Sequence, residues 1–95
     1  MSCLPQLQDW FVEQCNGDWE HSYGVKLETL DNPGWLVDID LYETKYDSKR
    51  FDAVMLERSE DDWLHCFVKD HKFQIRCGPR NLEEALGRFC DWLRQ

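Results

Sequence analysis

The chain has 95 residues, which is enough for one domain and too few for two. Hydrophobic residues make up 42% of the chain and aromatic residues 14%, so it can form an apolar core and we do not expect disorder. Eleven basic residues against 19 acidic ones give a net charge of -8. This charge repels phosphate backbones and anionic lipids and favours encounter with a basic protein. We therefore expect a single domain over residues 1–95, with no direct contact to nucleic acid or membrane.

The five cysteines are odd in number, form no C-x-x-C pair and are too few to stabilise a small secreted protein through disulfides. The first six residues lack a basic segment followed by an apolar run, and no stretch approaches the roughly 18 apolar residues of a membrane span. These features predict reduced thiols and a cytoplasmic protein. Cys15, Cys77 and Cys90 share the phase of apolar neighbours and are predicted to fill the core.

Apolar residues at helical spacing predict a helix over residues 4–15, ended by Asn16-Gly17. From Tyr23 to Thr29 the hydrophobic period changes to two, which predicts a half-buried strand. In Asp31-Asn32-Pro33-Gly34, Pro33 and Gly34 stand in the order of the central residues of a type II turn, where glycine takes a positive φ. A second strand over residues 35–41 is expected to pair antiparallel with the first. Gly24, Pro33 and Gly34 are the residues predicted to fix backbone shape.

The second half of the chain predicts more strands and a closing helix. A polar loop over residues 42–50 leads to strands over 51–58 and 63–69, joined by a turn at 59–62. The short alternating segment 73–77 is predicted to be a fifth strand at the edge of the sheet. Asn81 with Glu84 resembles a capping box, and the helix it opens runs to Leu93. We predict an α+β fold: an antiparallel sheet of four to five strands, with both helices on one face and the other face open.

One cluster of titratable residues suggests catalysis. Glu20 and His21, with Asp31, are the side chains that general acid/base chemistry or a metal would use. However, neighbours on a strand point to opposite faces, so Glu20 and His21 cannot easily act on one substrate atom. No catalytic residue is therefore predicted, and a small enzyme or metal-binding module using these three residues stays as the alternative hypothesis.

A zinc site is the other chemistry considered. His65 or Cys66, with His71 and Cys77, supplies suitable ligand types, but these residues lack the paired close spacing of structural zinc sites. No nucleophile elbow, Walker motif or Gly-x-Gly-x-x-Gly pattern is present in the sequence. We predict neither a metal nor a cofactor.

The five tryptophans divide into core positions and candidate interface positions. Trp10, Trp63 and Trp92 coincide with apolar segments, which predicts packing in the core or at its edge. Trp19 and Trp35 flank turns, where aromatic side chains beside acidic residues can anchor an interface, although the phase of Trp35 slightly favours the core.

Acidic residues on the strands are expected on the solvent side of the sheet. Glu28, Asp38, Asp40 and Glu57 fall there in the predicted register. They form either a docking face or a merely solubilising surface.

Two blocks carry a family resemblance: C-N-G-D-W-E-H-S-Y-G-V at residues 15–25 and E-T-L-D-N-P-G-W at residues 28–35. With them, the chain resembles the immunity protein 53 family of bacterial polymorphic toxin systems. The resemblance extends over nearly the whole chain, including the strand end at 40–44, Asp62-Trp63 and the helix at 82–92. It departs from the family pattern at Asn16, where we expect Asp, and at Gly78-Pro79, where we expect Asp-Pro.

The resemblance implies an intracellular antitoxin that binds the toxic domain of a cognate effector and has no catalytic activity. Such a toxin is often a nuclease, which would be basic, so an acidic inhibitor can occupy a surface meant for nucleic acid. The sequence leaves open whether the free protein is a monomer or a homodimer, and whether the segment from Trp19 to Trp35 binds or is structural. The residues predicted to contact the toxin are Trp19, Glu20, Glu28, Asp31, Asn32, Trp35, Asp38 and Asp40.

Overall fold

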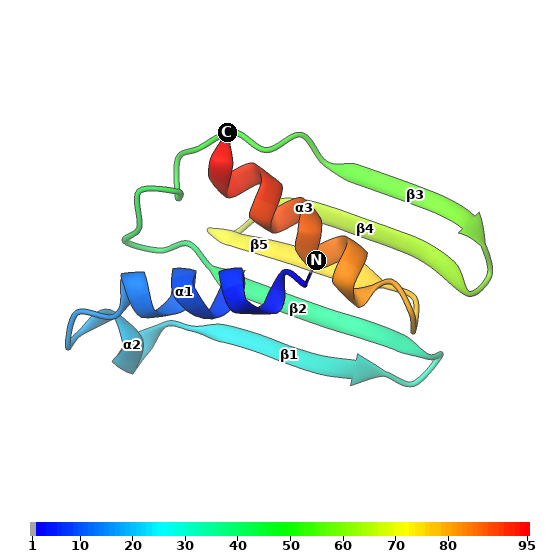
Figure 1. Ribbon diagram of the computed structural model, residues 1–95, viewed down its shortest axis with the longest axis horizontal. Helices are drawn as coiled ribbons and strands as arrows, with labels where there is room; N and C mark the ends of the chain where they lie inside the picture. Colours follow the sequence, from blue (N-terminus) through cyan, green and yellow to red (C-terminus); the bar gives the residue numbers. More distant parts are fainter. Residues whose placement is uncertain (1) are drawn as a thin grey trace.

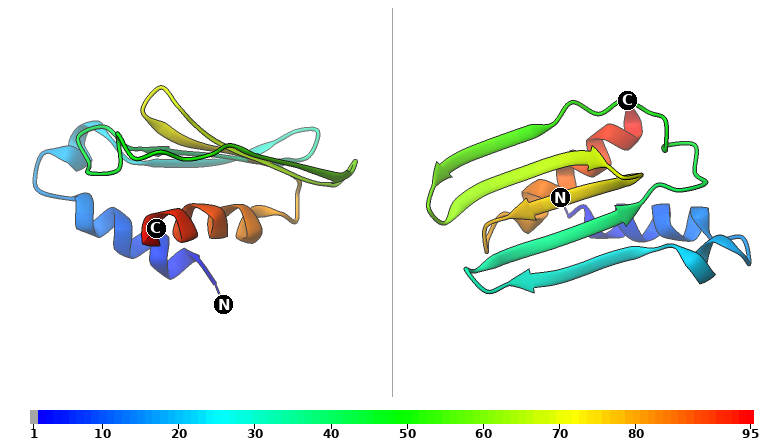
Figure 2. Two further views of the ribbon diagram at one scale, coloured as in Figure 1. Left: turned by 90° about the horizontal axis from the view of Figure 1, so that it is seen from above. Right: turned by 180° about the vertical axis from the view of Figure 1, so that it is seen from behind.

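The computed structural model describes residues 2–95. The protein forms a five-stranded antiparallel sheet with two long helices on one face (Figure 1). In chain order the elements are α1 (Leu4–Gln14), α2 (Trp19–Ser22), β1 (Val25–Leu30), β2 (Gly34–Asp40), β3 (Val54–Ser59), β4 (Asp62–Lys69), β5 (Lys72–Cys77) and α3 (Leu82–Arg94). Seen from above, α1 and α3 both lie below the sheet and its upper face is uncovered (Figure 2). The predicted α+β class is confirmed. Among residues 2–95, no helix is long and apolar enough to cross a membrane.

The strand order is β1-β2-β5-β4-β3, so β5 lies at the centre of the sheet. The predicted edge position of residues 73–77 is therefore wrong. After β2, residues 41–53 carry the chain to the far edge, and β3, β4 and β5 then return inward as a meander of hairpins. Phe73, Ile75 and Cys77 are fully buried, as a central strand under a helix requires. The predicted antiparallel pairing of the first two strands is confirmed, and the two strands predicted on either side of the 59–62 turn also pair antiparallel.

The core lies between the sheet and the helices. Phe73 of β5 packs against Phe89 and Trp92 of α3, with ring centroids 5.0 and 5.5 Å apart. Trp10 of α1 meets the same cluster, 5.4 Å from Phe89. The predicted core positions of Trp10 and Trp92 are confirmed, whereas Trp63 lies half-buried on the opposite face of the sheet.

Gly34 is required for a reason other than the predicted type II turn. It belongs to β2, where it pairs with Leu30, and its φ is not positive, so the turn prediction is wrong. A Cβ atom at this position would overlap the carbonyl oxygen of Cys77 on the neighbouring β5. Close approach of two strands, rather than backbone conformation, selects glycine here. Around Gly24, by contrast, a Cβ would meet nothing within 4 Å.

We predict that Gly34→Ala lowers the free energy of unfolding by about 1–3 kcal/mol, because β2 and β5 must separate to admit the methyl group. The matched control, Gly24→Ala, leaves the free energy of unfolding unchanged or raises it by up to about 1 kcal/mol. Urea unfolding followed by circular dichroism measures both. Equal effects of the two substitutions would contradict this role of Gly34.

The expected capping box of the C-terminal helix is replaced by a link to the sheet. Asn81 makes no side-chain cap bond; its Oδ1 accepts from the backbone N–H of Trp63 (3.3 Å), and its Nδ2 donates to Asp62 (2.9 Å) and Glu84 (3.4 Å). The Arg58 guanidinium joins the same two carboxylates, 2.6 Å from Glu84 and 2.9 Å from Asp62. This network ties the β3–β4 hairpin to the start of α3.

The network makes stability depend on pH. The hydrogen bonds from Arg58 are the main cause that lowers the pKa of both the Asp62 and the Glu84 carboxyl in the folded protein. A lowered folded-state pKa stabilises the protein above the unfolded-state values, 3.8 and 4.5, and this contribution is lost as pH falls through the folded values.

We therefore predict that Arg58→Met flattens the decline of unfolding free energy between about pH 5 and pH 3, measured by urea unfolding at each pH. Arg50→Met is the control, because Arg50 and its partner Asp52 are highly exposed, at 88% and 83%. An unchanged acid slope in Arg58→Met would contradict the assignment.

Candidate interaction surface

The side chains that point away from the helices form what we call the open face of the sheet. The strand registers place Glu28, Leu36, Arg76, His65 and Met55 in one row across all five strands. The adjacent row contains Lys26, Asp38, Gln74 and Phe67. In these two rows the side chains of β1, β2 and β5 are charged or polar except for Leu36, whereas β4 and β3 add the larger apolar groups Phe67 and Met55.

The acidic residues of β2 lie on the open face, and each is paired with a cation of β5. Asp38 lies 3.0 Å from Arg76, and Asp40 lies 3.3 Å from Lys72. Both carboxylate side chains are only 19% exposed. Their charge is therefore largely compensated within the chain, and the sheet below them is held together across two strands.

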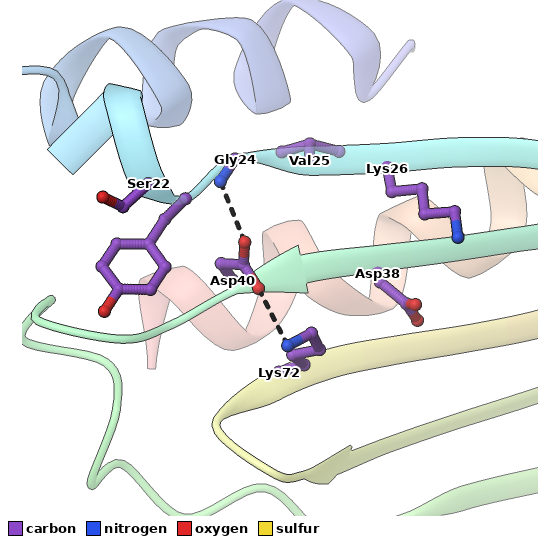
Figure 3. Close-up of a pocket in the computed structure, with 8 residues that line it drawn as sticks. Ser22, Gly24, Val25, Lys26, Asp38, Asp40 and Lys72 are labelled. Carbon is purple, nitrogen blue, oxygen red and sulfur yellow. Dashed lines mark hydrogen bonds and ion pairs between the residues drawn. The ribbon is translucent and has the colours of Figure 1, made fainter.

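A hollow of about 380 Å³ opens over the ends of β1, β2 and β5. Figure 3 shows the carboxylate of Asp40 between the backbone N–H of Gly24 and the ammonium group of Lys72, with Lys26 on the neighbouring β1 and Asp38 further along β2. The hydrogen bond to Asp40 is the main cause that raises the pKa of Lys72. Two cations and two anions line this hollow, so it offers hydrogen bonds rather than a net charge.

Asp40 also holds the start of β1 in place. Its Oδ2 accepts from the Gly24 N–H at 2.9 Å, and its own backbone N–H donates to the Gly24 carbonyl at 3.0 Å. We predict that Asp40→Ala lowers the free energy of unfolding by about 1–3 kcal/mol, because a half-buried donor and Lys72 lose their acceptor.

Glu28→Ala on the same face is the control for Asp40→Ala. The Glu28 side chain is 51% exposed and lies 3.7 Å from Lys26, so we expect a change within about 0.5 kcal/mol. Thermal or urea unfolding distinguishes the two variants, and a neutral Asp40→Ala would show that the contact has no structural role.

Three of the predicted contact residues have structural contacts within the fold. Trp19 is 4% exposed, packs edge-on against Trp10 and donates its Nε1–H to the carbonyl of Tyr42 at 2.8 Å. Trp35 points to the helix side and donates its Nε1–H to the carbonyl of Pro79 at 3.0 Å. Glu20 also has a local structural contact.

Glu20 closes the connection between α1 and α2. Its carboxylate accepts from the backbone N–H groups of Asn16 and Gly17 at 2.9 and 2.8 Å. Hydrogen bonds from its own backbone N–H and from those two groups lower the pKa of the Glu20 carboxyl. The segment 19–22 is a helical turn rather than the start of a strand, and the positive φ of Gly17 (89°) lets the chain reverse before it.

The Glu20, His21 and Asp31 cluster does not assemble. The six residues of β1 separate His21 from Asp31, a distance of roughly 20 Å at 3.3 Å per residue. Asp31 and Asn32 are exposed in the β1–β2 connection, at the end of the hairpin remote from α2. Trp19 and Asp31 therefore lie near opposite ends of β1, because the whole strand lies between them.

The considered zinc ligands are also kept apart by the sheet. His65 lies on the open face, whereas Cys66 and Cys77 are fully buried on the helix side. Within residues 2–95, no group of three or more His, Cys, Asp or Glu side chains is placed to hold a metal ion. Burial raises the pKa of Cys66 to about 12, of Cys77 to about 11 and of Cys90 to about 12, so these thiols stay protonated at neutral pH.

The apolar part of the open face was not anticipated. Trp63 and Phe67 on β4 are half-buried, and Met55 beside them on β3 is 61% exposed. The signal is present in the sequence, because β4 alternates between Leu64-Cys66-Val68 on one face and Trp63-His65-Phe67 on the other. A strand that is apolar on both faces indicates a sheet meant to be covered on both sides.

The helices cover one face of the sheet. The other face carries compensated charges, two half-buried aromatic groups and the exposed Met55. Together these features define a small α+β protein with a surface suited to protein contact. The chain belongs to the immunity protein 53 family, whose model matches residues 4–94. The family resemblance of the two sequence blocks is thereby confirmed. No curated protein and no solved structure matches the chain.

Proposed function

We propose that this protein is a cytoplasmic antitoxin that binds the toxic domain of a cognate polymorphic toxin and neutralises it by stoichiometric contact, without catalysis. Membership of an immunity-protein family, together with an open sheet face that carries the exposed Met55 and the half-buried Trp63 and Phe67, supports this proposal. The face supplies what binding needs: aromatic, methionine and arginine side chains, which are enriched in protein interfaces.

Charge supports a basic partner. The chain carries a net charge of -8, and complementary charge accelerates association more than it strengthens the final complex. A nuclease domain is a basic toxin of this kind, because it must attract nucleic acid phosphates. Inhibition then follows when the acidic protein covers the surface that nucleic acid would occupy.

The contact set centres on the open face. Of the residues predicted from sequence, Glu28, Asp38 and Asp40 lie on this face and Asp31 and Asn32 at its margin. Asp40 also supports the fold through Gly24 and Lys72, and Trp19, Glu20 and Trp35 support it away from this face. Met55, Phe67 and Trp63 join the set. This arrangement leaves the helix side free of the toxin.

The test begins with the tagged protein, used to capture its toxin from native lysate for identification by mass spectrometry. The captured toxic domain is then expressed in cells with and without the protein, and the purified pair is measured by light scattering. We expect restored growth and a one-to-one complex. Growth that stays arrested would contradict the proposed function.

Two variants with the same change of charge locate the contact. Met55 on the open face and Val12 on α1 are both large exposed apolar residues, at 61% and 67%. We predict that Met55→Lys weakens toxin binding about tenfold or more, as loss of an interface anchor does, whereas Val12→Lys binds as the wild type. Calorimetric titration measures the affinity of both variants. Weaker toxin binding by Val12→Lys together with unchanged binding by Met55→Lys would place the interface on the helices.

A further inference from the structure

A second hollow lies on the open face, over the turn end of the β3–β4 hairpin. It has a volume of about 320 Å³ and is lined by Glu57, Ser59, Glu60, Trp63 and His65. Glu57 pairs with Trp63 across the two strands, and the register shifts between Glu57 and Ser59. Such a shift bends the strand and re-aims its side chains, which brings both glutamates to the border of one aromatic floor. We call this the Trp63 hollow.

The Trp63 ring is half-buried, and no side-chain cation of the described residues lies over it. Lysine ammonium groups lie over three other aromatic rings: 5.2 Å from Tyr42, and 5.4 to 5.7 Å from Tyr46 and Trp92. Within residues 2–95, no lysine or arginine takes the corresponding position over Trp63. Because indole is the aromatic group that attracts cations most strongly, this ring is an unused cation acceptor.

The carboxylates of this hollow are not compensated as those of β2 are. Among the described residues, neither Glu57 nor Glu60 forms an ion pair with lysine or arginine. The Glu57 side chain is 73% exposed, and its Oε1 lies 3.0 Å from Nε2 of His65, which positions the carboxylate beside the aromatic floor. The His65 ring in turn packs 5.2 Å from the Trp63 ring.

We propose that the Trp63 hollow receives a basic side chain of the toxin, an arginine or lysine, stacked on the indole between Glu57 and Glu60. This inference rests on the proposed function and names the chemistry of the contact. Arginine fits best, since its planar guanidinium stacks on aromatic rings and bonds carboxylates in a bidentate manner. Met55, opposite His65 on β3, lies beside the hollow as the apolar neighbour that excludes water from a contact of this kind.

The chemistry is tested first without the toxin. N-acetyl-L-argininamide is titrated into the ¹⁵N-labelled protein while the five tryptophan indole N–H resonances are followed by NMR. N-acetyl-L-citrullinamide, which has nearly the same shape and no charge, is the control ligand. We expect a saturable shift of the Trp63 resonance with the arginine compound alone, and its loss in the Glu57→Gln/Glu60→Gln variant. An unmoved resonance, or equal shifts with both compounds, would overturn the proposal.

The same variant is then measured against the captured toxic domain. Glu57→Gln/Glu60→Gln should weaken the complex about tenfold or more, with the larger loss at low salt. The control is Asp9→Asn/Glu13→Gln, which removes the same two charges from exposed positions on α1 and should bind as the wild type.

The outcomes separate the inference from the proposed function. Equal binding by wild type and Glu57→Gln/Glu60→Gln would remove the Trp63 hollow from the interface and leave the antitoxin role intact. A wild-type protein that captures no toxic domain and protects no cells would instead refute the antitoxin role, and the titration with the arginine compound would still decide the chemistry of the hollow.

Discussion

The packing of α3 against β5 determines the rest of this structure. Phe89 and Trp92 lie on Phe73 at the middle of the sheet, so the last strand in the sequence must be the central one. Residues 41–53, which connect β2 to β3 and so let β5 take the central place, are themselves bonded to α3. Lys49 donates to the carbonyl of Trp92 at 2.6 Å, and the Trp92 indole donates to the carbonyl of Arg50 at 2.7 Å. Helix, central strand and long connection thus depend on one aromatic cluster.

This arrangement covers one face of the sheet with helices and leaves the other open. The acidic residues of β2 are compensated by β5, which stabilises the sheet without adding net charge at its centre. Uncompensated carboxylates and large apolar groups gather instead over β3 and β4, around Trp63 and Met55. A surface with this composition is typical of a protein interface, and membership of the immunity protein 53 family gives it a partner class.

Local patterns predicted the elements well, because helical and strand periods are properties of short segments. Both long helices, the two hairpins and the solvent side of Glu28, Asp38 and Asp40 followed from them. The central place of β5 could not be predicted in this way, because it depends on where the long connection over residues 41–53 leads. The sequence suggested that a turn requires glycine at position 34. The structure shows instead that the carbonyl oxygen of Cys77, 43 residues later in the chain, leaves no room for a Cβ atom there. Trp63 was assigned to the core because an apolar strand does not reveal which of its two faces the helices cover.

Hydroxyl-radical footprinting of the protein, free and bound to its toxic domain, tests the central claim most directly, because it reports the exposure of individual side chains. The open face predicts that oxidation of Met55 and Trp63 falls in the complex, while that of Leu4 and Phe11 on α1 is unchanged. Protection of Leu4 and Phe11 with unchanged oxidation of Met55 and Trp63 would place the toxin on the helices and contradict the account.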